Sequence, residues 1–336
     1  MKVVIVGFGR MGQRHAQVVR ELGLELVAVC DKNMSQLSDV AEKFGIVSTM
    51  RYEDPMAMLV AVKPQCVIVA TTAPTHCEYT CMAAEHGVKY ILCEKPMAVS
   101  LEECDRMITS CKRSGTTLAI NHQMRFMEQY TESKRIVQDV LGGLTSVTVI
   151  AGNFGMAMNG THYFEMFRYM TNEFPKEVTA WFSDGDVANP RGPQFKDRAG
   201  SIRLVSSSNQ RFYLDTSDDQ GHGLQVIYAG RYGQLVVDEL AGLMRWVVRE
   251  DQHRALPTTR YGMPWLEHTR KIAPADVIEP SKAVLKALLE EKNYPTGEEG
   301  RAAVAALVAA YVSHENSHRN VLIDNNLPLS RIFPWA

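Results

Sequence analysis

The sequence lacks a strong charge of either sign and a long apolar run, and each absence excludes a class of protein. Its 336 residues carry 36 basic and 38 acidic side chains, a formal net charge of −2. This balance indicates neither a nucleic-acid partner nor an anionic membrane. No apolar run approaches the roughly 20 residues that cross a bilayer. The N-terminus enters the strand-like segment KVVIVG, which is unlike a signal peptide. We therefore expect a cytoplasmic protein.

A disulfide framework is also lacking. All seven cysteines lie in the first third of the chain, at positions 30, 66, 77, 81, 93, 104 and 111. An odd number, placed in segments typical of buried strands and helices, argues against paired cysteines. Cys77 and Cys81 are one helical turn apart, as metal ligands can be, but no second pair stands at zinc-finger spacing. We expect buried thiols and no metal site.

The length predicts two domains, because 336 residues exceed what one compact core usually holds. We expect a dinucleotide-binding domain over residues 1–122 and a domain for substrate binding and oligomerisation over residues 123–336.

The chain opens with a strand, a glycine turn and a helix, KVVIVGFGRMGQRHAQVVREL. Gly7, Gly9 and Gly12 fit G-x-G-x-x-G, in which the glycines permit the tight turn, the approach of a pyrophosphate and close helix packing. A second strand, LELVAVCD, ends in Asp31, which can accept hydrogen bonds from a ribose 2′-OH and would repel a 2′-phosphate. NAD is thus favoured over NADP, although Lys32 adjoins Asp31. The alternative is a glycine-rich turn without a ligand.

Strands and helices then alternate as far as residue 126. We expect strands over 45–50, 64–72, 88–96 and 116–126, and helices over 54–62, 74–87 and 100–115. This alternation predicts a doubly wound parallel sheet, which binds ligands at the carboxyl ends of its strands. The polar residues expected at these ends are Thr71, Thr72, Glu94, Lys95 and Asn121.

Beyond residue 143 the pattern changes to short strands with polar turns, typical of an antiparallel meander. We expect strands over 144–155, 176–185, 199–210, 211–218, 223–230, 233–242 and 243–251. A helix near 162–171 interrupts them, residues 183–198 form a loop that could act as a lid, and helices follow over 281–293 and 296–316. The second domain is thus an α+β domain with an open, mainly antiparallel sheet. If its face without helices is apolar, we expect a homodimer or homotetramer through it.

The motifs VGFGRMG, CEKPMA, NHQMRF and NGTHYFEMFRYM resemble the Gfo/Idh/MocA oxidoreductases, the family of glucose–fructose oxidoreductase and inositol dehydrogenase. The resemblance spans nearly the whole chain, and E-K-P is its most specific element. It implies an NAD(P)-dependent dehydrogenase or reductase acting on a hydroxyl-bearing carbon of a sugar, cyclitol or nucleotide-sugar. We predict cofactor contacts at Gly7, Phe8, Gly9, Arg10, Met11, Gly12, Asp31, Thr71, Thr72, Pro74, His76, Glu94, Lys95 and Asn121.

The resemblance places Lys95 beside the nicotinamide, where a partly desolvated lysine near a positive ring tends to have a lowered pKa and can transfer the substrate proton. Elsewhere a lysine at this place would be an exposed strand-end residue. Glu94 could orient Lys95, bind a cofactor ribose or form a structural pair. His76 could equally be a helix-start capping residue or a cofactor contact.

His162 matches the family's proton-transfer histidine, but the aspartate usual four residues earlier is Met158 here. The later acid of the family is present as Glu165. Three roles stay open for His162. It acts as an acid/base with Lys95, which we favour, or it binds substrate while Lys95 transfers the proton alone, or it is structural.

Further substrate contacts are predicted at Arg125, Asn159 and Tyr163. The arginine could bind a carboxylate or phosphate of the substrate, or pair with an acid of the protein. Two other functions also fit the motifs: an NAD-dependent glycosidase of the same family, and a dinucleotide-sensing regulator that Met158 would favour and Lys95 would not require.

Overall fold

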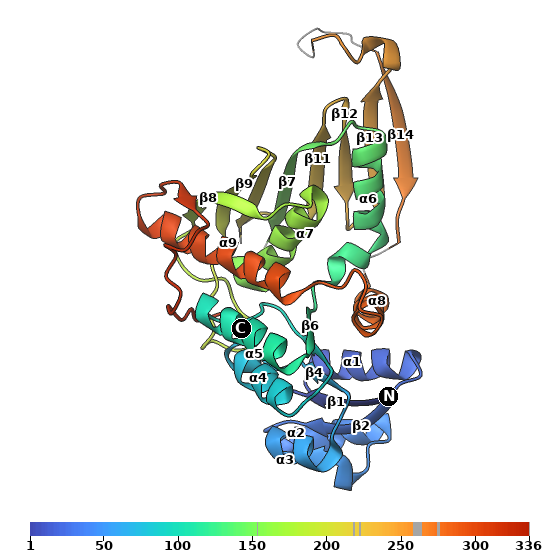
Figure 1. Cartoon of the computed structure of the whole chain (residues 1–336). Coiled ribbons are helices and arrows are strands. Elements are labelled where there is room, and N and C mark those ends of the chain that lie inside the picture. The colour runs from blue at the N-terminus through green and yellow to red at the C-terminus, as the bar shows by residue number, and fades with distance from the viewer. Residues whose placement is uncertain (153, 218, 222, 258–263, 274–275, 336) are drawn as a thin grey trace. The chain divides into compact units, whose positions relative to one another are not determined.

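The chain forms two compact units (Figure 1). The computed structural model describes residues 1–152, 154–217, 219–221, 223–257, 264–273 and 276–335. Unit 1 comprises Met1–Gln123, Asp276–Val304 and Pro328–Ala336, and unit 2 comprises Met124–Ala275 and Ala305–Leu327. The first break lies next to the expected boundary between residues 122 and 123. The sequence predicted one boundary between two domains. The structure differs, because two C-terminal segments of the chain belong to unit 1.

Unit 1 contains a six-stranded parallel sheet in the order β3-β2-β1-β4-β5-β6. The order reverses direction at β1, so right-handed connections place helices on both faces. This confirms the predicted doubly wound sheet. Its strands are β1 (Lys2–Val6), β2 (Glu25–Cys30), β3 (Arg51–Tyr52), β4 (Cys66–Val69), β5 (Tyr90–Cys93) and β6 (Thr117–Ile120).

In unit 1, α1 packs against α8, and α4 packs against α5 and also contacts α3. The helices are α1 (Arg10–Glu21), α2 (Met34–Ala41), α3 (Pro55–Val62), α4 (His76–Glu85), α5 (Leu101–Ser114), α8 (Ile278–Leu289) and the first part of α9 (Gly297–Glu315). The helix predicted over 100–115 is confirmed as α5, and Ser100 caps it, since its side chain accepts a hydrogen bond from the Glu103 N–H.

The strand predicted over 45–50 is wrong. Ser48–Met50 form a single 3₁₀ turn, and the strand is only Arg51–Tyr52. Val47 is 60 % exposed, so the apolar residues that suggested a strand do not all enter the core. Sequence patterns also missed α2.

Unit 2 is built on a nine-stranded sheet, counted over the described residues, in the order β14-β13-β12-β11-β7-β10-β9-β8-β15. The pairing of β7 with β10 is parallel and the others are antiparallel, which confirms a mainly antiparallel sheet. Its strands are β7 (Leu144–Gly152), β8 (Pro175–Phe182), β9 (Gly200–Ser206), β10 (Arg211–Ser217), β11 (Gln225–Gly230), β12 (Gly233–Asp238), β13 (Leu243–Arg249), β14 (Trp265–Lys271) and β15 (Val321–Leu322).

One face of this sheet carries helices. In Figure 1, α6 (Glu128–Asp139) and α7 (Thr161–Thr171) lie over its central strands. Side chains on the helix side are buried, for example Ala180, Phe212 and Met244, and their chain neighbours point to the other face. The expected helix near 162–171 is confirmed as α7, and residues 183–198 form a loop without helix or strand. No described helix is long and apolar enough to cross a membrane.

Candidate functional site

The turn between β1 and α1 has the close backbone contacts that the glycine pattern predicts. Gly7 has a φ of +88°, and a Cβ there would lie 2.7 Å from the backbone of Ala70 and Thr71. A Cβ at Gly12 would lie 2.1 Å from the carbonyl oxygen of Gly7. A Cβ at Gly9 would meet no atom of the described residues within 4 Å. The turn is therefore open at the N-terminus of α1, as pyrophosphate binding requires.

Asp31, at the end of β2, is bonded to this turn. Its carboxylate accepts hydrogen bonds from the backbone N–H of Phe8 at 2.7 Å and of Asn33 at 2.9 Å. Carboxylate oxygens have further lone pairs, which can accept from a ribose hydroxyl. The open turn and Asp31 together fit NAD.

Glu94 is the centre of a buried polar network at the carboxyl end of β5. Its Oε1 atom lies 2.7 Å from His15 Nε2 and accepts a hydrogen bond from Asn121 Nδ2 at 2.8 Å, while Oε2 accepts from the backbone N–H of Lys95 at 3.4 Å. Burial alone would raise the pKa of Glu94, but His15, Lys95 and Asn121 lower it to about 2. The carboxylate is therefore ionised and fixes its neighbours. Of the roles left open for Glu94, the structure shows a pairing with His15 and a bond to the Lys95 backbone.

Lys95 follows directly, and the residue is 9 % exposed. The peptide bond to Pro96 is cis. The carbonyl of Pro96 lies 3.0 Å from His76 Nδ1, and His76 Nε2 lies 3.2 Å from the carbonyl oxygen of Thr71. His76 thus connects the segments that follow β4 and β5, and its side chain does not cap α4.

The remaining predicted cofactor residues lie at the same edge of the sheet. Arg10 and Met11 begin α1, and the hydroxyl of Thr71 accepts a hydrogen bond from Thr75 at 2.8 Å. Thr72 and Pro74 lie in the partly exposed segment before α4. These residues stand where the carboxyl ends of parallel strands meet, and their contacts with a cofactor stay predictions.

In unit 2, a π-helical turn, Met156–Gly160, leads into α7. Asp197 holds it: the carboxylate accepts hydrogen bonds from the N–H groups of Ala157 at 2.9 Å and Met158 at 2.8 Å. Because Asp197 is 2 % exposed, this is a buried cap at a helix start. Position 158 therefore has a carboxylate against its backbone, although its own side chain is a methionine.

The predicted substrate residues of this segment differ in their placement. His162 is 9 % exposed in the first turn of α7, and Asn159 is partly exposed. Tyr163 is buried and stacks on Phe154 with ring centroids 5.9 Å apart. Tyr163 is therefore placed as a packing residue of unit 2.

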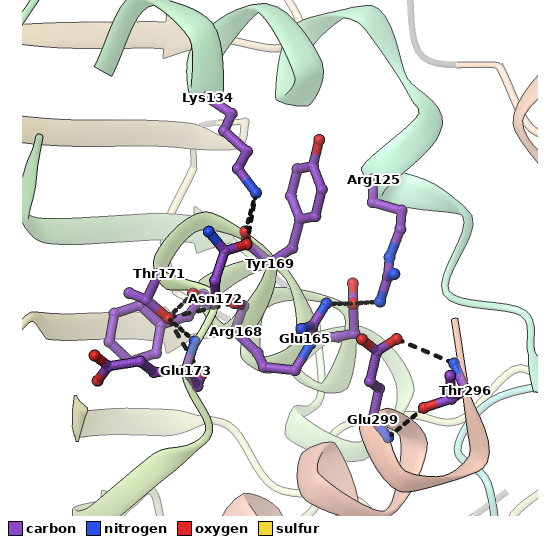
Figure 2. Close-up of polar contacts among 11 residues, drawn as sticks. Arg125, Lys134, Glu165, Arg168, Tyr169, Thr171, Asn172, Glu173, Thr296 and Glu299 are labelled. Carbon is purple, nitrogen blue, oxygen red and sulfur yellow. Dashed lines mark hydrogen bonds and ion pairs between the residues drawn. The ribbon is translucent and has the colours of Figure 1, made fainter. Parts of the chain in front are cut away.

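Arg125 pairs with an acid of the protein, one of the two roles left open for it. Figure 2 shows Arg125 and Arg168 both directed at Glu165, with Arg168 Nη2 at 3.2 Å from Oε1. Glu165 is 1 % exposed and Arg125 is 8 % exposed. A guanidinium pair around one carboxylate fixes the orientation of Arg125 over α7. Beside it, Lys134 donates to the carbonyl of Tyr169 at 2.6 Å.

Two residues of these networks were not predicted from the sequence. His15 lies in α1 and is 1 % exposed; a histidine on the apolar stripe that follows the glycine turn was the available signal. Asp197 lies in the loop 183–198, and no sequence pattern connects it with the turn that it caps, 40 residues earlier.

Comparison with known proteins gives a consistent result. Residues 1–122 match the model of the oxidoreductase family with an NAD-binding Rossmann fold, GFO_IDH_MocA. D-glucoside 3-dehydrogenase of Escherichia coli is 36 % identical over 154 residues, which cover 45 % of this chain and 43 % of that protein. The match thus spans less than half of that relative.

Two further similarities extend over nearly the full length. Myo-inositol 2-dehydrogenase of Thermotoga maritima is 24 % identical over 94 % of this chain and 96 % of its own. The structure of an oxidoreductase from Agrobacterium radiobacter, in complex with NAD+, L-tartaric acid and magnesium, has a TM-score of 0.80 at 19 % identity and covers 96 % of this chain and 98 % of its own. At that identity the structural similarity shows the fold alone.

Proposed function

We propose that the chain is an oxidoreductase of the Gfo/Idh/MocA family, a proposal that the family match of residues 1–122 and the similarity to the glucoside and inositol dehydrogenases support. It would then be an NAD-dependent dehydrogenase or reductase of a hydroxyl-bearing carbon in a sugar, cyclitol or nucleotide-sugar. The observation that carries the proposal is the network that fixes Lys95 in the same sheet as the open glycine turn. When bound, NAD supplies the hydride acceptor or donor.

Lys95 is the proton-transfer residue in this proposal. Its backbone is held through Glu94, which His15 and Asn121 keep ionised and oriented. A lysine amine with little access to water can take the proton of a substrate hydroxyl and return it in the reverse direction. Removal of the amine should therefore affect turnover and not the hold on the nucleotide.

His162 and Arg125 are the proposed substrate residues of unit 2. The turn that precedes His162 is fixed by Asp197, and Arg125 is oriented by Glu165. Because Asp197 bonds to backbone N–H groups, it does not replace the missing side-chain acid at position 158. We propose that His162 is an acid/base residue and that Arg125 and Asn159 orient the polyol.

The first experiment is a fluorescence titration with NADH and NADPH after any co-purified nucleotide has been removed, followed by a screen of sugars and cyclitols with NAD at 340 nm. Preference for NADH is expected from Asp31. For Lys95→Ala we expect turnover to fall about 100-fold or more with the Kd for NADH unchanged. Lys43→Ala, at an exposed position, is the matched control.

Unchanged turnover in Lys95→Ala would contradict the assignment of the lysine. Cleavage of a glycoside without net change in NADH would instead indicate the glycosidase branch. Tight NADH binding without turnover of any sugar would indicate a regulator.

We also propose that the chain forms a homodimer or homotetramer through the face of the unit 2 sheet that lacks helices. Strand register places Trp181, Tyr213, Leu243 and Trp265 on this face, and they are 37–60 % exposed. Large exposed apolar side chains on the face without helices support an interface. Light scattering on Trp181→Glu combined with Tyr213→Glu tests it, since monomers are expected if the face is the interface.

A further inference from the structure

The chain that follows Lys95 runs through the interior of unit 1 without regular structure. Residues 94–100 belong to no helix or strand, yet Met97 and Ala98 are fully buried and Val99 is 3 % exposed. Buried backbone groups outside a helix or a sheet must find other hydrogen-bond partners. The partners of this segment therefore decide how the chain leaves Lys95.

Two of these partners come from a segment of unit 1 that is remote in sequence, Pro328–Ala336. The indole N–H of Trp335 donates a hydrogen bond to the carbonyl oxygen of Ala98 at 3.0 Å, across 237 positions of the chain. The backbone N–H of Phe333 donates to the carbonyl oxygen of Val99 at 2.9 Å. Two consecutive carbonyl groups behind Lys95 are thus held by residues 333–335.

This remote segment is itself fixed in unit 1. Trp335 is completely buried and Phe333 is 2 % exposed, and their rings stack with centroids 4.5 Å apart and planes at 8°. The guanidinium of Arg331 lies 4.5 Å from the centroid of the Phe333 ring. The carbonyl oxygen of Leu329 accepts a hydrogen bond from the Glu102 N–H at 2.9 Å, which connects the segment with α5. A stacked, enclosed indole keeps its N–H pointing in one direction.

Other contacts hold the remaining backbone groups around Lys95. The carbonyl oxygen of Pro96 lies 3.0 Å from His76 Nδ1, and the N–H of Val99 donates to the Glu103 carboxylate at 3.2 Å. On the amino side, the N–H of Lys95 donates to the carboxylate of the preceding residue. Because the allowed directions of a side chain depend on its backbone angles, these contacts also limit where the lysine side chain points.

We propose that Trp335 is a positioning residue for Lys95: by holding the Ala98 carbonyl, its indole N–H keeps the chain behind Lys95 in the path that directs the amine at the reacting hydroxyl. The inference rests on the proposed function, which gives the proton transfer to Lys95. Trp335 acts through the backbone and touches neither cofactor nor substrate. A buried carbonyl that loses its donor is left unsatisfied, so the segment shifts toward another donor.

Trp335→Phe is the variant that tests this inference, because it removes the N–H donor and keeps an aromatic ring beside Phe333. Trp246→Phe is the matched control, since it makes the same exchange at a tryptophan of unit 2 that stacks on His268. The thermal unfolding midpoint and the Kd for NADH show that each variant is folded. We expect the Kd for NADH to equal that of wild type in both variants.

The first test observes Lys95 directly and needs no substrate. The full chain is acetylated with limiting acetic anhydride across a range of pH, and the rate at Lys95 is measured by peptide mass spectrometry relative to the exposed Lys43. In Trp335→Phe we expect Lys95 to react about threefold or more faster than in wild type, because the segment behind it is no longer held. The control should show the wild-type rate. A wild-type rate in Trp335→Phe, or an equal rise in Trp246→Phe, would overturn the inference.

The second test is a double-mutant cycle on the turnover of a sugar found by the screen with NAD. We expect kcat to fall about tenfold in Trp335→Phe, with KM unchanged, because the proton-transfer group is displaced from the reacting hydroxyl. If Trp335 acts through Lys95, the double variant Lys95→Ala with Trp335→Phe is no slower than Lys95→Ala alone. Losses that multiply in the double variant, or a change confined to KM, would overturn the inference.

Failure of the inference and failure of the proposed function give different results. Turnover that is lost in Lys95→Ala and unchanged in Trp335→Phe would overturn the role of Trp335 alone. Unchanged turnover in Lys95→Ala would contradict the proposed function as well. Because the acetylation rates need no substrate, they test the hold of Trp335 on the Lys95 segment in either case.

Discussion

Two glutamates, one in each unit, have opposite acidities, although the one with the lower pKa is the more deeply buried. Glu94 in unit 1 is completely enclosed, and its pKa is lowered to about 2 by His15, Lys95 and Asn121 against the effect of burial. Glu239 in unit 2 follows β12, and desolvation raises its pKa to about 7. The only opposing cause is a hydrogen bond from the neutral hydroxyl of Tyr130, which is too weak to cancel the rise. Burial alone therefore does not decide the charge of a carboxyl; the number and charge of its donors do.

The difference matches what the two positions do. Glu94 accepts from a histidine, an amide and a backbone N–H at the strand end that carries Lys95. Its permanent charge fixes a site. Glu239 is partly exposed and lies beside the buried Tyr130, Tyr163 and Tyr228 of unit 2, where a proton can satisfy the carboxyl instead of a cation.

A third glutamate, Glu165, faces two arginines, which are always charged. Its replacement is expected to have the largest effect on the free energy of unfolding. Glu165→Gln removes the charge that Arg125 and Arg168 share, and a broken buried pair costs about 3–5 kcal/mol. Urea unfolding of the variant, with hydrogen exchange in α7 as the local readout, measures it. Glu267→Gln breaks an exposed pair with Arg245 and should leave the midpoint unchanged. If both variants lost the same small amount of unfolding free energy, the buried ion pair would be no stronger than the exposed one, which would contradict the prediction.

Glu94→Gln is expected to have an intermediate effect, because glutamine still accepts from Asn121 while the charge facing His15 is lost. We expect a loss of about 2–3 kcal/mol at pH 7, detected by faster exchange in α1 with α7 unaffected. The folded-state pKa lies below the usual 4.5. This contribution is therefore present above about pH 4.5 and is lost as the pH falls toward 2. If the free energy of unfolding fell with pH in the same way in the variant and in wild type, the ion-pair explanation would be refuted.

Glu239→Gln should give the smallest change, with the opposite pH dependence. The folded-state pKa of about 7 lies above the usual 4.5, so the stabilising proton is fully bound below about pH 4.5, and the contribution is lost as the pH rises through 7. The glutamine has no proton to lose. Relative to wild type it should become more stable by about 1–2 kcal/mol between pH 5 and pH 8. Urea unfolding midpoints of both proteins across this pH range measure the difference. If the stability of the variant relative to wild type fell with rising pH, the raised pKa of Glu239 would be excluded.

The local pattern of the sequence predicted most of unit 1. Continuous Val and Ile runs marked β1 and β4, and the Ser100 cap and Gly115 marked the ends of α5. It failed at β14, which is exposed along nearly its whole length. An edge strand without buried alternation gives no apolar signal, and it is a strand because β13 pairs with it.

The site shows the same limit. Chain order and residue type identified the glycine turn, Asp31 and the Glu94–Lys95 segment, since each is a short continuous motif. They did not identify His15 as the partner of Glu94 or Asp197 as the cap of Met158, because these partners are 79 and 39 residues apart.

The sequence by itself therefore determined the class of each unit and the nucleotide turn, both of which depend on periodicity and spacing along the chain. Only the tertiary structure decided which acid each cation faces, that Arg125 pairs with Glu165, that Tyr163 packs inside, and that Glu94 and Glu239 differ in charge. The physical reason is that a pKa or an ion pair depends on distance and solvent access, and folding sets both between residues that are remote in sequence.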